Sequence, residues 1–145
     1  MEPDLIACLE EAMELPEKDF SQYSPLTLAW LGDSVYDVIV RTLLTRKANK
    51  QAYKLHREAS SMVCAKAQAA MITALQPFLS EQEAAIYRRG HNASPSHNAK
   101  NATRREYLEA TGFEALVGFL YLQKDYRRMM ELIKKGWELT GMGED

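Results

Sequence analysis

The sequence predicts an all-α protein, and three observations lead to this fold class. Apolar residues recur at helical spacing along most of the chain, whereas no stretch alternates apolar and polar residues as a half-buried strand does. Helix-start and helix-stop residues bound the periodic segments, and no repeat or low-complexity tract interrupts them. The chain has 145 residues, of which 46% are hydrophobic, and this is enough for one domain with a core. We therefore expect a single helical domain over residues 1–145.

Three helices are expected in the first half of the chain. Residues 3–15 form an amphipathic pattern, and a connector over residues 18–23 leads from it to a second helix. Ser24 and Pro25 form the start of that second helix, which should extend to about residue 45 and be central and mostly buried. A long third helix is predicted over residues 49–74, where many alanines indicate close helix–helix contact.

Three further helices are expected in the second half. Ser80 and Glu83 form a capping box that opens a short helix ending at Gly90. Residues 92–102 are rich in Asn, Ser, Ala and Pro and are predicted to form an exposed loop. Thr103 and Glu106 form a second capping box, which opens a helix to about residue 122. The last helix should run from Asp125 to residue 140 and end before a glycine.

The composition points to a cytoplasmic protein. Two cysteines lie far apart in helical contexts, which is typical of reduced thiols and not of a disulfide framework or a metal cluster. The N-terminal segment is acidic and lacks the basic and apolar regions of a signal peptide. No apolar run approaches the length of a membrane span, so no membrane association is expected.

Charge is distributed unevenly, although the net charge is only −2. Residues 1–19 are strongly acidic, whereas residues 88–105 contain no acid at all. Such segregation predicts a face that binds a polyanion, and the alternative is a set of solvated helix faces with a loop between them. The candidate nucleic-acid contacts in this segment are Arg88, Arg89, His91, Asn92, Lys100, Arg104 and Arg105. For His91 and His97, phosphate contact or no role is favoured over acid–base catalysis.

Two residues of the second helix do not fit a helix built only for packing. Gly32 costs about 1 kcal/mol relative to alanine in a helix interior, so we expect that the backbone must be bare there. Asp33 places a carboxylate among apolar neighbours, and a buried charge is tolerated only when it is paired or bound to a metal. The alternative is that Asp33 simply reaches solvent.

The helix after the second capping box repeats this pattern. Glu114 is the single charge in residues 111–122, and Gly118 lies one turn along on the same face. Two apolar helices, each with one acid beside a glycine, predict a close crossing that brings two carboxylates together. Carboxylates that share a site repel and raise one pKa unless a cation lies between them, and Mg²⁺ is the hard oxygen-binding ion that suits them.

Together these residues resemble the ribonuclease III family. The stretch Leu28-Ala29-Trp30-Leu31-Gly32-Asp33-Ser34-Val35 is similar to that family's signature, and Phe113-Glu114-Ala115-Leu116-Val117-Gly118 is similar to its second acidic motif. The resemblance covers roughly residues 20 to 125. It is strongest for the Mini-III subgroup, which lacks the double-stranded-RNA-binding domain. Other acids of full-length ribonuclease III are replaced here by Leu26, Ala29 and Thr111.

The resemblance implies a metal-dependent endoribonuclease. Asp33 and Glu114 would be the catalytic residues and would bind Mg²⁺, which would activate a water against a phosphodiester of double-stranded RNA. The products would carry 5′-phosphate and 3′-hydroxyl ends, and the substrate would be precursor large-subunit ribosomal RNA, possibly with ribosomal proteins. Asp37 is expected to pair with Arg41 at i+4 instead of joining the metal.

The resemblance also implies a homodimer, because cutting both strands of a duplex calls for two sites related by a two-fold axis. Trp30 would anchor the dimer interface, and its alternative is a place in the core of its own chain. Two other functional classes stay open. One is a catalytically degenerate module that binds double-stranded RNA without cutting it, and the other is a helical interaction protein with structural acids. A cleavage assay with and without Mg²⁺ separates the three.

Overall fold

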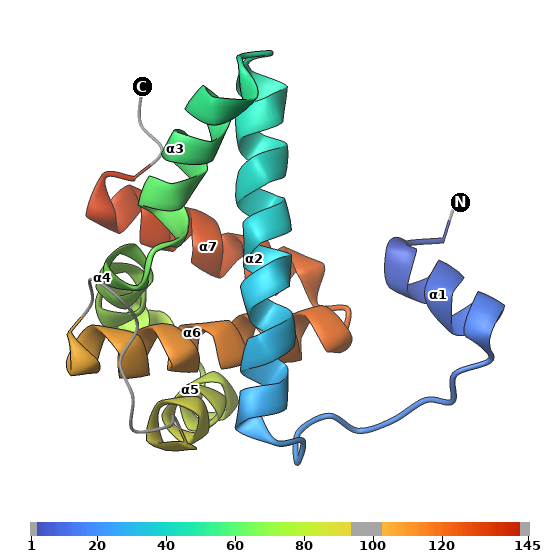
Figure 1. Cartoon of the computed structure of the whole chain (residues 1–145). Coiled ribbons are helices and arrows are strands. Elements are labelled where there is room, and N and C mark those ends of the chain that lie inside the picture. Colours follow the sequence, from blue (N-terminus) through green and yellow to red (C-terminus); the bar gives the residue numbers. More distant parts are fainter. Residues whose placement is uncertain (1–2, 94–102, 143–145) are drawn as a thin grey trace.

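The computed structural model describes residues 3–93 and 103–142, and every regular element within them is a helix. The all-α prediction is therefore confirmed. The elements, labelled in Figure 1, are α1 (Leu5–Met13), α2 (Pro25–Lys47), α3 (Ala52–Val63), α4 (Ala65–Leu75), the 3₁₀ turn η1 (Gln76–Phe78), α5 (Glu81–Ala93), α6 (Arg104–Leu122) and α7 (Tyr126–Thr140). In this described part of the chain, no helix is both long and apolar enough to cross a lipid bilayer.

The fold is built around the crossing of α2 and α6, which Figure 1 shows as an upright and a transverse helix. Their backbones touch at two glycines. A Cβ atom on Gly32 would lie 1.8 Å from the Glu114 carbonyl oxygen, and one on Gly118 would lie 2.0 Å from the Leu28 carbonyl oxygen. Backbone atoms cannot move aside as a flexible side chain can, so only glycine fits at either position. The expected need for bare backbone at Gly32 is confirmed, and so is the predicted close crossing.

The core beside this crossing centres on Tyr36, which is fully buried. Its ring packs edge-on against Phe113, with 5.1 Å between ring centroids. Its hydroxyl accepts a hydrogen bond from Trp137 Nε1 at 2.9 Å, so α2, α6 and α7 meet at one side chain. Burial raises the pKa of the Tyr36 hydroxyl to about 12, which keeps this core group neutral.

The predicted long third helix is wrong, because two helices replace it. Cys64 adopts an extended conformation (φ −66°, ψ 158°) and separates α3 from α4. The first of these helices begins after Gln51, not at Asn49. A single extended residue shifts the apolar pattern too little to be visible in the sequence, so the periodicity appears continuous across the break.

The capping boxes are confirmed in the structure. Ser80 and Glu83 exchange hydrogen bonds of 2.8 and 3.1 Å, and Thr103 and Glu106 do the same at 3.0 Å in each direction. The predicted end of α5 at Gly90 is wrong, because the helix continues to Ala93. Gly90 is buried within it, where a Cβ would lie 2.7 Å from Ala115 Cβ, so this glycine permits helix contact and does not stop the helix.

The starts of α2 and α7, which have no capping box, are only partly as predicted. Pro25 occupies the first turn of α2, but the Ser24 side chain makes no capping hydrogen bond. The backbone carbonyl oxygen of Ser24 accepts a hydrogen bond from the Leu28 N–H at 3.1 Å. Asp125 likewise stands at the start of α7 without a side-chain cap, and Gly141 ends that helix in a left-handed conformation as expected.

The N-terminal helix α1 lies to one side of the other helices (Figure 1). Ile6 is its buried residue, whereas Leu5, Leu9 and Met13 on its apolar side are exposed. Polar contacts link this region to the rest of the fold: Glu10 pairs with Lys124, Asp4 is hydrogen-bonded to Tyr126, and the Arg89 guanidinium donates to carbonyl oxygens of the connector that follows α1. The amphipathic pattern therefore predicted a helix correctly, but most of its apolar side has no partner in the described chain.

Candidate active site

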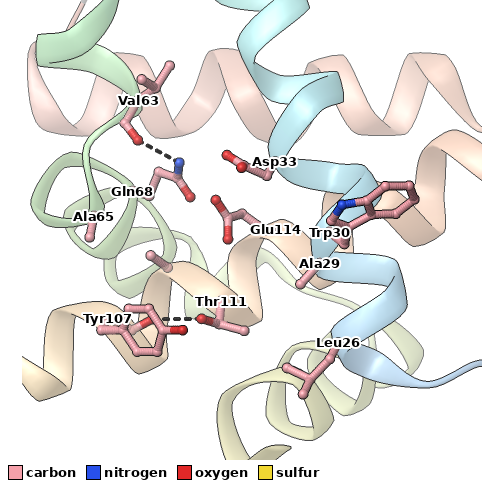
Figure 2. A pocket seen from close by; sticks show the side chains of 11 residues that line it. Leu26, Ala29, Trp30, Asp33, Val63, Ala65, Gln68, Tyr107, Thr111 and Glu114 are labelled. Carbon is pink, nitrogen blue, oxygen red and sulfur yellow. Dashed lines mark hydrogen bonds between the residues drawn. The ribbon is translucent and has the colours of Figure 1, made fainter. Parts of the chain in front are cut away.

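A cleft of about 500 Å³ opens where α2 and α6 cross, and the junction between α3 and α4 closes its far side. Its lining, drawn in Figure 2, consists of Leu26, Ala29, Trp30, Asp33, Val63, Ala65, Gln68, Tyr107, Ala110, Thr111 and Glu114. Both acids that the sequence singled out therefore lie in one cavity.

Asp33 and Glu114 point toward one another across the cleft (Figure 2). The glycine contacts explain this placement, because Gly32 adjoins Asp33 and packs on the backbone of Glu114 itself. Asp33 is exposed at the edge of the cleft, whereas Glu114 is only partly accessible. The expectation of a buried Asp33 is thus wrong: its side of α2 opens into the cleft, and the burial falls on Glu114.

Burial is the main cause of an unusual electrostatic state at Glu114. It raises the pKa of the Glu114 carboxyl to about 9, and the neighbouring Asp33 adds to the rise through its charge and a hydrogen bond. The amide of Gln68 acts in the opposite direction but more weakly. At neutral pH the metal-free pair therefore retains a proton on Glu114, which a bound cation would displace.

Sequence reasoning missed one polar residue of this site, Gln68. Its side chain is 2% exposed, and its Nε2 donates to the Val63 carbonyl oxygen at 2.8 Å. Its Oε1 is buried without a hydrogen-bond partner in the described structure. One signal in the sequence could have indicated Gln68: it is a polar residue among alanines, on a helix predicted to make close contacts. This signal is weak, because Gln is common on exposed helix faces.

The residues of the cleft fit a small divalent cation. Two facing carboxylates and one unpartnered amide oxygen offer hard oxygen ligands, which Mg²⁺ prefers, and the cleft leaves room for water. Among the described residues, no cluster of three or more His, Cys, Asp or Glu side chains provides an all-protein metal site. A cation in this cleft would therefore keep much of its water shell.

Two further residues near the acids have other partners. Asp37 pairs with Arg41 at 3.0 Å, as the i+4 spacing predicted, and it does not line the cleft. The Thr111 hydroxyl lines the cleft but donates to the Tyr107 carbonyl oxygen at 2.9 Å, within its own helix. Thr111 stands where the resemblance had led us to look for another acid, so no additional carboxylate takes its place.

The predicted nucleic-acid contacts fall into different settings. Arg88 and Arg104 are exposed, and His91 and Asn92 near the end of α5 share a contact of 3.1 Å between ring nitrogen and amide oxygen. Arg105 pairs with Glu109 at 2.8 Å while most of its side chain stays exposed. Lys100 and His97 lie outside the described residues.

Arg89 departs from the role predicted for it. Its two terminal nitrogens donate to the carbonyl oxygens of Ser21 and Tyr23 at 2.7 and 3.0 Å, so it fastens the connector before α2. The structure therefore gives Arg89 a part in the fold, and its contact with nucleic acid remains a prediction.

Trp30 lies at the edge of the cleft and is 77% exposed. This excludes the alternative of an ordinary place in the core of its own chain. Leu26 and Val38 on the same helix are exposed as well, so the expectation that α2 is mostly buried is wrong on this side. Exposed large apolar residues on one helix are typical of an interaction surface.

Comparison with known proteins agrees with this geometry. Residues 26–125 match the family model described as the ribonuclease III domain, a range that contains both carboxylates and both glycines of the crossing. The chain therefore belongs to the ribonuclease III family, whose members are endoribonucleases.

Within that family, the curated relatives are Mini-ribonuclease 3 proteins. One from Symbiobacterium thermophilum is 42% identical over 120 residues, which cover 83% of this chain and 92% of the relative. Another, from Thermoanaerobacter sp., is 37% identical over 134 residues, covering 92% of this chain and 94% of the relative. A crystal structure of a Fusobacterium nucleatum protein superposes with a TM-score of 0.73 at 29% identity, covering 81% of this chain and 94% of that one. The resemblance to the Mini-III subgroup is thus confirmed.

Proposed function

We propose that this protein is a Mg²⁺-dependent endoribonuclease that cleaves double-stranded RNA, with Asp33 and Glu114 as its metal-binding catalytic residues. The observation that carries the proposal is the facing pair of carboxylates in an open cleft, with no positively charged side chain paired to Glu114 in the described chain. Such a pair is electrostatically unfavourable by itself and becomes favourable when a divalent cation lies between its members.

The roles of the two acids follow from their exposure. Asp33 and Glu114 would hold the Mg²⁺, and the chemistry that the ion would supply there is activation of a water and compensation of charge on the phosphate, with products that carry 5′-phosphate and 3′-hydroxyl ends. Glu114, held by the contact of its own backbone with Gly32, fixes one side of the cation site. Asp33, at the exposed edge, holds the side that faces the incoming RNA backbone. Neither role requires a nucleophilic side chain, and the described lining of the cleft contains no serine or cysteine.

Double-stranded RNA is the substrate that suits a site of this kind. Proteins recognise A-form RNA mainly by its shape and through phosphate and 2′-hydroxyl contacts. A cleft of about 500 Å³ has the size for a phosphate group of the backbone and not for the duplex itself. From the resemblance of the sequence to the Mini-III subgroup, we further propose a base-paired region of precursor large-subunit ribosomal RNA as the substrate. With this substrate we propose a cytoplasmic location and the assistance of ribosomal proteins bound to the precursor.

Replacing Asp33 by Asn tests the catalytic proposal. The side chain keeps its size and hydrogen-bonding capacity but loses the charge that a cation needs, so cleavage in Mg²⁺ should fall by orders of magnitude. The assay measures cutting of a labelled RNA duplex, with circular dichroism to check that helical content persists. Asp37→Asn is the matched control, because it removes an equivalent carboxylate one turn along the same helix and outside the cleft.

The outcomes separate the functional classes. Cleavage by the wild type that requires metal, and that Asp33→Asn lacks while Asp37→Asn retains it, supports the enzyme. Near-normal cutting by Asp33→Asn would refute the proposed mechanism. RNA binding without cutting by the wild type would indicate a catalytically degenerate binding module, and neither activity would indicate a structural interaction protein.

We propose that the basic segment around the end of α5 and the start of α6 contacts the RNA backbone. The exposed Arg88 and Arg104 are its best-placed described members, with His91, Asn92 and Arg105 beside them and Lys100 outside the described residues. Each phosphate contact that is lost should reduce the slope of log affinity against log salt by about 0.7–0.9. Arg88→Gln with Arg104→Gln should therefore flatten the salt dependence of binding, measured by fluorescence anisotropy. An unchanged slope would mean that these arginines do not contact the RNA backbone.

We also propose a homodimer in which Trp30 packs into the partner subunit. The support is a large aromatic side chain that is 77% exposed, beside exposed Leu26 and Val38 on the same helix. Trp30→Ala should yield a helical protein that dissociates and loses double-strand cutting, since two antiparallel strands call for two sites. Sedimentation across a range of concentrations measures this. A wild type that is monomeric at micromolar concentration, or a fully dimeric Trp30→Ala, would contradict the proposal.

A further inference from the structure

The helix break at Cys64 and the cleft are connected through Gln68. In an uninterrupted helix the Val63 carbonyl oxygen would accept the N–H of residue 67. Because the chain is extended at Cys64, that carbonyl instead accepts the side-chain Nε2 of Gln68 at 2.8 Å. The backbone N–H of Gln68 meanwhile donates to the Cys64 carbonyl oxygen at 3.0 Å. The break thus anchors both the backbone and the amide nitrogen of one side chain.

This anchoring settles which end of the amide faces the cleft. With Nε2 committed to a backbone carbonyl, Oε1 is the end left for the cavity that Gln68 shares with Asp33 and Glu114. Figure 2 shows the amide extending from the α3–α4 junction toward the two carboxylates. Three oxygen-bearing side chains from three helices, α2, α4 and α6, therefore converge on the same space.

The Gln68 oxygen is unusual because it is buried and has no donor in the described structure. A buried acceptor left unsatisfied costs about 1–3 kcal/mol, and native proteins retain such groups rarely. Its neighbours in the cleft are two acids. In the metal-free protein the proton on Glu114 can serve one acceptor at a time, and once a cation displaces that proton both carboxylates are acceptors only. What would satisfy all three groups together is a positive ion with its bound water.

We propose that Gln68 Oε1 is the third protein oxygen of the divalent-cation site formed by Asp33 and Glu114. The inference rests on the proposed metal-dependent function and deepens it. Two carboxylates already balance the charge of a divalent cation, so a third acid would add repulsion, whereas an amide adds a hard oxygen without charge. Leu26, Ala29 and Thr111 stand where full-length ribonuclease III carries further acids, and here a neutral oxygen from a different helix lies in the same cleft.

Metal binding by the metal-free protein tests this, without recourse to catalysis. Calorimetric titration with MgCl₂ gives the affinity, and thermal unfolding with and without MgCl₂ gives the metal-dependent rise in melting temperature. Gln68→Met removes both polar ends of the amide at similar size and should weaken Mg²⁺ binding about tenfold or more. Gln76→Met is the matched control: Gln76 donates to the Ile72 carbonyl at 3.1 Å as Gln68 does to Val63, but it lies outside the cleft.

Gln68→Glu keeps the test valid if Gln68→Met folds poorly. It retains an oxygen in the same place, loses the bond to Val63, and adds a third negative charge beside two others. The metal-free variant should melt below the wild type, while MgCl₂ should raise its melting temperature by more than it raises that of the wild type. A residue that only braces the helix break would lower both melting temperatures equally and leave the rise unchanged.

The outcomes distinguish this inference from the function on which it rests. If the wild type binds Mg²⁺ and Asp33→Asn does not, the site is established. If Gln68→Met then binds as the wild type does, or Gln68→Glu gains no extra stabilisation from the metal, Gln68 is a brace and the inference is wrong. If the wild type binds no divalent cation, both the proposed function and the inference are wrong.

Discussion

Two acids within the helical body differ sharply in their surroundings. Glu83 on α5 is 6% exposed and receives two hydrogen bonds from the Arg128 guanidinium, at 2.8 and 2.9 Å. Arg128 also donates to the Phe78 carbonyl at 2.7 Å, so the pair ties α5 and η1 to α7. Glu114 on α6 is also largely withdrawn from solvent, yet its nearest ionisable neighbour is another acid, Asp33.

The difference shows how a structural acid can be told from a functional one. Arg128 holds the pKa of Glu83 below its ordinary value, so that acid is ionised and its interaction is complete within the chain. Burial and Asp33 raise the pKa of Glu114 to about 9, so in the metal-free protein that acid is neutral at neutral pH. A buried acid with an arginine holds the fold together, whereas one that faces a second acid in an open cleft is available for chemistry.

Matched Glu→Gln substitutions should separate the two acids most strongly. Glu114→Gln should reduce RNA cleavage by orders of magnitude because it removes a proposed cation ligand. It should leave the free energy of unfolding of the metal-free protein unchanged or higher, since the amide is neutral at every pH and folding no longer requires a proton to be taken up at this position. Both quantities are measurable on one preparation, by a duplex cleavage assay and by urea unfolding in EDTA.

Glu83→Gln should produce the opposite pattern. Loss of the charge opposite Arg128 should lower the free energy of unfolding by about 2 kcal/mol, because a hydrogen-bonded ion pair with one well-buried partner is broken. Cleavage at a temperature where the variant is folded should stay close to that of the wild type. The comparison fails if Glu83→Gln abolishes cleavage while folded, or if Glu114→Gln is the more destabilised of the two.

A further effect, of opposite sign at the two acids, should be visible in the pH dependence of stability. The pKa of Glu83 is lowered from 4.5, so its contribution is present above that pH and is lost as the pH falls below it. The pKa of Glu114 is raised from 4.5 to about 9, so its contribution is present below pH 4.5 and is lost as the pH rises toward 9. Urea unfolding of the metal-free protein should accordingly show stability declining between these values, and Glu114→Gln should remove that decline. A decline of equal size in Glu114→Gln would assign it to other groups.

Much of this architecture could be predicted from sequence, because its signals are local. Each capping box pairs two residues three apart, and both capping boxes lie where they were predicted. The glycine beside each acid indicated a close crossing. Glycine is unfavourable inside a helix, so its presence there is expected where another backbone packs too closely for a side chain. The apolar pattern could not predict which side of α2 faces solvent. Asp33, Trp30 and Val38 lie among apolar neighbours in the sequence, but all three are on the exposed side of the helix.

The parts of the site that sequence could not supply depend on contacts between distant segments. The break at Cys64 leaves apolar periodicity intact, so α3 and α4 appeared as one helix. Gln68 gained significance only when its amide was seen anchored to Val63 and its oxygen left in the cleft. Likewise, the burial of Glu114 comes from packing around α6, which no local pattern records.

The glycine-to-backbone crossing also has a consequence for when the protein can act. Asp33 belongs to the second helix and Glu114 to the sixth, so their meeting depends on contacts of large sequence separation, which carry the greatest loop-closure cost and form slowly. A growing polypeptide that has not yet completed α6 lacks the proposed catalytic pair, and so does a chain whose crossing has opened. On the proposed mechanism, RNA cleavage is therefore confined to the finished fold.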